Sequence, residues 1–135
     1  MPLRLVGAPP GGRFRALSLS LRIGALYDFV LAGLMLLAPE LLQRAFALPL
    51  PGEAFYLRTM AVLLAMVAGV YLVAASDPAA HRPLVAIAIV GRLAGFLSLL
   101  PSALGEPRLA GAWGPALGDL AFAAVHAATA RRLWR

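Results

Sequence analysis

Four ionisable side chains interrupt four long apolar runs of the sequence, one in each run: Asp28, Arg58, Arg92 and Asp119. An ionisable group at the depth of a lipid bilayer is costly, so it marks either a functional site or a buried ion pair. The four charges sum to zero, which favours two ion pairs that set the register of neighbouring helices. A binding site for a ligand or a proton is the alternative that the residues leave open.

His126 extends this candidate site, because it follows Asp119 by one heptad and therefore shares its helix face. An imidazole titrates near physiological pH, so His126 could relay protons or bind a ligand head group. A structural histidine held by a hydrogen bond fits the same position. The candidate cluster, whether ligand-binding or structural, is therefore Asp28, Arg58, Arg92, Asp119 and His126.

Residues for other chemistries are missing from the chain. It has no cysteine and only two histidines, and His81 falls in a predicted loop, so a haem or metal site would need ligands from another subunit. Gly91 and Gly95 lie inside an apolar run with no strand before them, so they do not form a phosphate-binding loop. We therefore assign no catalytic residue and no metal site, and enzymatic catalysis has no support.

Composition and segment length predict the elements that hold these residues. Hydrophobic residues make up 61% of the 135 residues and charged residues 13%, which is typical of a membrane protein. Four segments, about 21–42, 55–76, 83–104 and 113–133, each have about the 20 residues that cross a bilayer as a helix. The predicted fold is all-α: a polytopic membrane protein whose residues 21–135 form four transmembrane helices in an up-down bundle. Residues 1–20 are predicted to be a cytoplasmic N-terminal segment.

The arginines predict the orientation in the membrane. Eight fall on the side of the N-terminal segment, the second connection and the C-terminal end: Arg4, Arg13, Arg15, Arg22, Arg82, Arg131, Arg132 and Arg135. The opposite connections hold Arg44 and Arg108, with Arg58 at a helix edge. Cytoplasmic loops carry the arginine excess, so both termini are expected in the cytoplasm, and the cytoplasmic membrane of a bacterium or archaeon is the expected location.

The net charge of +6 follows from this topology and from contact with anionic membrane lipids, and it does not indicate nucleic acid as a partner. The tyrosines and tryptophans fall mostly near the predicted interfaces, where an aromatic belt is expected.

Counting about 1.5 Å of helix rise per residue gives the depth of each buried charge. Arg58 and Asp119 lie near the outer edge, whereas Asp28 and Arg92 lie deeper. We therefore predict an outer pair of Arg58 with Asp119 and an inner pair of Arg92 with Asp28, with Arg92 able to switch between the acids. Small residues that permit close helix contact support an inward orientation of these faces: Gly24, Ala61, Ala65, Gly69, Gly91, Gly95, Gly114 and Gly118.

The charges form a pattern with the ends of the segments: Asp28 and Pro39 in the first, Tyr56-Leu57-Arg58 at the start of the second, Gly91-Arg92 in the third and Gly118-Asp119 in the fourth. This pattern covers most of the chain and resembles the small four-helix DoxX-like membrane proteins. The resemblance implies a non-catalytic accessory bundle, associated with quinone-linked redox complexes. Such a bundle would bind a quinone or lipid, or join a larger membrane complex or homo-oligomer. No catalytic residue transfers with it.

Four-helix small multidrug transporters provide the alternative function, which is proton-coupled export of a small molecule by a homodimer. Asp28 would then be the proton-carrying acid. The chain lacks the tryptophan-flanked glutamate that those transporters have in their first helix. Its acids also have arginines available as partners, which hold a carboxylate ionised. Transport therefore ranks second to the binding of a ligand or partner.

Overall fold

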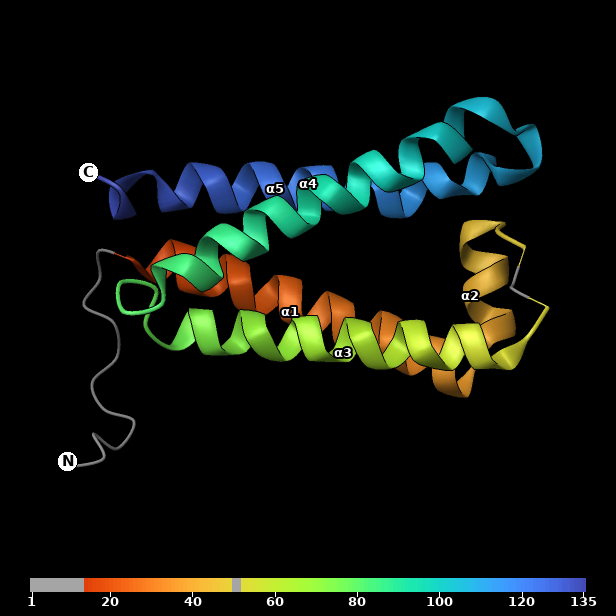
Figure 1. Cartoon of the computed structure of the whole chain (residues 1–135), viewed down its shortest axis with the longest axis horizontal. Helices are drawn as coiled ribbons and strands as arrows, with labels where there is room; N and C mark the ends of the chain where they lie inside the picture. The colour runs from red at the N-terminus through yellow and green to blue at the C-terminus, as the bar shows by residue number, and fades with distance from the viewer. Residues whose placement is uncertain (1–13, 50–51) are drawn as a thin grey trace.

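The computed structural model describes residues 14–49 and 52–135, and this part of the chain is helical and contains no strand. Four long helices make up most of it (Figure 1): α1 (Arg15–Leu37), α3 (Ala54–Ser76), α4 (Arg82–Gly105) and α5 (Trp113–Ala130). Shorter elements follow the first, third and fourth of these: α2 (Pro39–Phe46) and the 3-10 helices η2 (Pro107–Ala112) and η3 (Arg131–Leu133). The all-helical fold class is confirmed for these residues.

The first helix differs from the predicted segment 21–42 at both ends. It begins at Arg15, so the last part of the predicted N-terminal segment, 1–20, is helical, and residues 1–13 lie outside the described part of the chain. It stops at Leu37 because Pro39 follows. The residue before a proline avoids helical geometry, and Ala38 has φ −148° and ψ 58°. Pro39 then opens α2, where the first helical position needs no amide donor.

The other long helices follow the predicted segments closely. α3 and α4 begin and end within one residue of 55–76 and 83–104. α5 begins at Trp113 and ends at Ala130, and η3 completes the segment 113–133. Of the described helices, α1, α3 and α4 are long and apolar enough to cross a membrane. α5 is not among them, because Asp119 and His126 lower the hydropathy of its 18 residues.

The long helices pack in two pairs that contact each other (Figure 1). α1 lies against α3, α4 lies against α5, and α1 also contacts α5. Consecutive long helices run in opposite directions, so the start of α1, the connection from α3 to α4 and the C-terminal end lie at one end of the molecule. α2 lies across the other end.

The end of α2 docks against η2 and the start of α5 through two glycines. A side chain at Gly111 would overlap the carbonyl group of Phe46, and one at Gly114 would come within 2.8 Å of the Phe46 ring. Glycine is therefore required where the backbones meet. This contact holds α2 across the ends of the long helices.

Small residues fill much of the interior, and large apolar residues cover much of the exterior. The buried core lies toward the end that holds the start of α1, and its members are Leu17, Leu21, Ala25, Ala68, Tyr71, Ala74, Ala75, Val85, Ala88, Ala130 and Leu133. Leu26, Met66, Val90 and Leu117, one from each long helix, are exposed. Among the described residues, two charged side chains and one imidazole are buried as well: Asp28, Arg92 and His126. Large apolar side chains over the exterior and charged groups in the interior are both unusual in a water-soluble domain.

Candidate functional site

Arg92 of α4 joins three helices through its guanidinium group. Its Nη1 donates a hydrogen bond to Asp119 Oδ1 of α5 at 2.7 Å. Its Nη2 lies 2.8 Å from Asp28 Oδ1 of α1 and donates to the carbonyl oxygen of Gly24, also on α1, at 3.1 Å. We call Asp28, Arg92 and Asp119 the charged cluster. The predicted pairing of Arg92 with Asp28 is present, and Arg92 contacts both acids at once.

Arg58 does not belong to this cluster. It is exposed on α3 and lines a shallow apolar depression with neighbours such as Phe55 and Val62. None of the salt bridges among the described residues includes it, and Asp119 binds Arg92 instead. The predicted outer pair of Arg58 with Asp119 is therefore wrong. Counting residues gave the depth of Arg58, but α3 buries the face that carries Leu57 and directs Arg58 outward.

Three aromatic rings surround the Arg92 guanidinium. Its Cζ lies 4.8 Å from the ring centre of Phe122, 5.1 Å from that of Tyr71 and 5.6 Å from that of Tyr27. Aromatic faces attract a cation and partly replace the water that burial removes. An interfacial position was predicted for most of the tyrosines, and it is wrong for Tyr71, because this residue is buried in the core. Phe122 could have been found from its position three residues after Asp119, on the same helix face.

Glycines on three helices make room for these polar groups. A side chain at Gly95 would overlap the carboxylate of Asp119. One at Gly24 would lie 3.2 Å from His126 Nε2, and one at Gly118 would lie 3.3 Å from the Tyr27 hydroxyl. The small residues seen in the sequence therefore admit charged and polar side chains between the helices, in addition to permitting close packing.

His126 of α5 is fully buried beside the cluster. Its Nδ1 lies 3.1 Å from Ser20 Oγ, and the Ser20 hydroxyl donates its own proton to the carbonyl of Leu17. Ser20 Oγ must then accept from His126, which places the proton of a neutral imidazole on Nδ1. Nε2 is consequently a bare acceptor, and it has no hydrogen-bond partner among the described residues.

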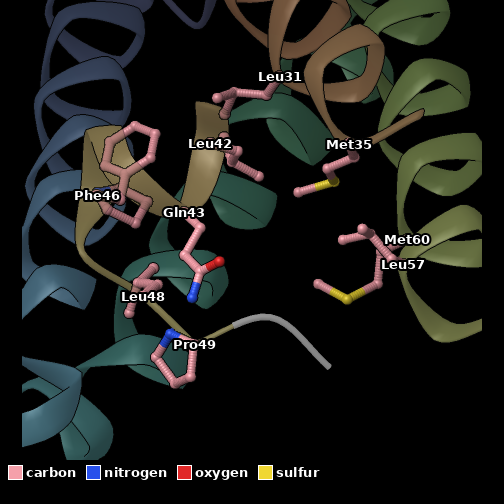
Figure 2. A pocket seen from close by; sticks show the side chains of 10 residues that line it. Leu31, Met35, Leu42, Gln43, Phe46, Leu48, Pro49, Leu57 and Met60 are labelled. Atoms are coloured by element: carbon pink, nitrogen blue, oxygen red, sulfur yellow. The ribbon is translucent and has the colours of Figure 1, made fainter. Parts of the chain in front are cut away.

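An apolar cavity of about 230 Å³ lies at the other end of the molecule, beneath α2 (Figure 2). The residues that line it are Leu31, Met35, Leu42, Gln43, Phe46, Leu48, Pro49, Leu57, Met60 and Pro115. Gln43 is the only amide side chain in the whole chain. Figure 2 shows it extending from α2 toward the space that Met35, Leu57 and Met60 also face. This site was not predicted, although Gln43 is an isolated amide shortly after Pro39.

The chain matches no protein-family model, no curated protein and no solved structure. Within the described ranges, no group of three or more His, Cys, Asp or Glu side chains could hold a metal ion. The charged cluster and the cavity are therefore the features of the described residues that could serve a function.

Proposed function

We propose that the chain is an integral membrane protein that forms a four-helix up-down bundle. The exposed faces of all four long helices carry large apolar side chains, whereas the charged cluster and His126 lie between the helices. This is the arrangement expected when lipid surrounds the bundle. α5 crosses the membrane together with the other three long helices, because its two polar side chains are sheltered from lipid: Asp119 binds Arg92 and His126 is fully buried. Its 18 residues extend about 27 Å.

The ends of the bundle support an orientation with both termini in the cytoplasm. The end that holds the start of α1, the α3–α4 connection and the C-terminal residues is rich in arginine: Arg15, Arg22, Arg82, Arg131, Arg132 and Arg135. The opposite end holds Arg44 and Arg58, and Arg108 beside Glu106. By the positive-inside rule, the first end faces the cytoplasm of a bacterial or archaeal cell.

The proposed activity is non-catalytic binding of a lipophilic molecule with a polar head group, such as a quinone or a lipid. One observation carries this proposal: an apolar cavity with a single amide side chain, that of Gln43, in its lining. Ligand sites are mostly apolar, with a few polar groups that fix the orientation of the ligand. A volume of about 230 Å³ suits a head group whose tail remains in the bilayer. The DoxX-like resemblance, with its link to quinone-dependent complexes, agrees with this class of ligand.

Binding can be tested with the full chain in lipid nanodiscs and a short-tailed benzoquinone, measured by native mass spectrometry. Met60→Trp places an indole in the lining of the cavity and should abolish binding. Met66→Trp changes a similarly exposed methionine of α3 outside the lining and should leave binding unchanged. Gln43→Leu removes one hydrogen bond and should weaken binding by up to about tenfold. A parallel titration with phospholipid distinguishes a lipid from a quinone. Equal binding by the two tryptophan variants would refute the cavity as the site.

A further inference from the structure

The charged cluster holds one more acid than base. Asp28 and Asp119 share the single cation of Arg92, because Arg58 lies outside on the surface. With all three groups ionised, the interior carries a net charge of −1. An uncompensated charge between apolar helices is strongly unfavourable. One bound proton would make the cluster neutral.

The hydrogen bonds indicate which acid takes that proton. The guanidinium of Arg92 donates to Asp119 and to the carbonyl of Gly24. Asp28 lies close to Arg92 Nη2, but neither of its carboxylate oxygens accepts a hydrogen bond from the described residues. The Asp28 side chain is 1% exposed, against 18% for Asp119, so water also solvates Asp28 less. An ionised carboxylate is least well satisfied at Asp28.

The other ionisable groups around Asp28 come from every helix packed there. α3 contributes Tyr71, whose hydroxyl donates to the carbonyl of Ala88, and α1 contributes Tyr27, which packs on Arg92 and Phe122. α5 contributes His126, which packs on Tyr71 and Phe122. Two nitrogen atoms lie next to Gly24. A Cβ atom added at Gly24 would be 3.2 Å from His126 Nε2 and 3.5 Å from Arg92 Nη2. Asp28 is one helical turn further along the same face of α1. Among these groups, His126 Nε2 is the available base.

We propose that Asp28 binds one exchangeable proton and that His126 is the base that accepts it. In the protonated state, Asp28 is a neutral carboxylic acid and Arg92 with Asp119 is the remaining ion pair. Among the described residues, no ion pair joins Asp28 to His126 directly, so a bridging water carries the proton. On transfer, the O–H bond of Asp28 breaks and its electron pair stays on the carboxylate, while the water takes this proton and passes one of its own to His126 Nε2, where an N–H bond forms. The imidazolium formed balances the new carboxylate, so the net charge of the interior stays at zero.

This proton site gives Arg92 two alternative arrangements. When Asp28 is neutral, the guanidinium pairs with Asp119 on α5. When Asp28 is ionised, it competes with Asp119 for the same guanidinium and draws Arg92 toward α1. Proton transfer therefore changes the balance of the contacts that Arg92 makes with α1 and α5. This inference is independent of the ligand proposed for the cavity.

Infrared spectroscopy of the full chain in nanodiscs tests the proposal, because a protonated carboxyl group has its own carbonyl stretch. At pH 7 the protein should show one such band, and Asp28→Asn should abolish it. Asp119→Asn should abolish it as well, because Asp28 then pairs alone with Arg92 and ionises. Glu40→Gln and Asp77→Asn change exposed acids and should leave the band unchanged.

The role of His126 has a separate readout. His126→Gln should retain the band but slow the exchange of the acid proton with deuterated water. Unchanged exchange would overturn that role. Absence of the band from the wild-type protein at pH 7, or its persistence in Asp28→Asn, would overturn the proton site. If Asp28→Asn fails to fold, the wild-type spectrum and the Asp119→Asn spectrum decide the question.

Discussion

Replacing Arg92 should destabilise the protein strongly, whereas the same change at Arg58 should not. The sequence places both arginines inside apolar runs, but only Arg92 is buried with two carboxylates. Arg92→Gln removes the cation and keeps a polar side chain of moderate size. Arg58→Gln is the matched control on the exposed face of α3.

The loss of stability in Arg92→Gln is set by Asp119, the acid that loses its hydrogen-bond partner. Among the described residues, Asp119 accepts its side-chain hydrogen bond from Arg92 alone. Without Arg92 it must stay charged in an apolar interior or take up a proton. Removing one partner of a buried ion pair costs about 3–5 kcal/mol. Protonating an ordinary aspartate at pH 7 costs about 4 kcal/mol, which limits the loss to a similar value. Arg58→Gln should change the free energy of unfolding by less than about 0.5 kcal/mol.

Acidification provides a check on the cause. If Arg92→Gln is less stable because a carboxylate has lost its cation, protonation of this carboxylate should restore stability. The difference in the free energy of unfolding between the wild type and Arg92→Gln should then shrink by about 1.4 kcal/mol for each pH unit below 7. The double variant Arg92→Gln/Asp119→Asn should recover most of the loss, because no isolated charge remains.

The assay is reversible unfolding of the purified chain in mixed micelles with increasing denaturing detergent, followed by circular dichroism. Similar losses in Arg92→Gln and Arg58→Gln would refute the assignment of a buried role to Arg92 alone. A deficit that grows at lower pH would refute the electrostatic explanation.

Two further predictions concern contacts between the helices, measured in the same unfolding assay. Gly95→Ala places a methyl group against the Asp119 carboxylate and should lower the free energy of unfolding by about 1–3 kcal/mol. Gly69→Ala has open space around it and should change the free energy of unfolding by less than about 0.5 kcal/mol. Equal effects of the two changes would contradict the close approach of the Asp119 carboxylate to α4 at Gly95. Ser18→Ala removes a buried hydrogen bond from α1 to a carbonyl of α3 and should cost about 1 kcal/mol. Ser98→Ala removes an exposed bond within α4 and should have little effect, so a larger loss at Ser98 would argue against the α1–α3 link.

The helices could be predicted from the sequence because their boundaries depend on local features. Apolar runs of spanning length predicted α3 and α4 closely, and prolines mark the connections. The beginning of α1 was missed because Arg4, Arg13 and Arg15 suggested a polar leader over residues 1–20, whereas the helix already begins at Arg15. The end of α1 was predicted five residues too late, beyond Pro39, because the apolar run continues into α2.

The site was predictable only in part, because it depends on how each helix is rotated. The sequence identified Asp28, Arg92 and Asp119 as buried candidates, and depth counting gave the contact between Arg92 and Asp28. Depth does not give rotation, so Arg58 was assigned to Asp119 while α3 directs it outward. The cavity depends on the crossing of α2 over the bundle, which no periodicity in the sequence encodes.

The charged cluster and the cavity share two of their helices, so the two proposed sites have a physical route for coupling. Leu31 and Met35 line the cavity and lie about 5 and 10 Å further along α1 than Asp28. Pro115 lines it one helical turn before Asp119 on α5. A change in how Arg92 divides its contacts between α1 and α5 would therefore move the walls of the cavity. By thermodynamic linkage, a ligand that fits one spacing of these helices better must also favour one protonation state of the cluster.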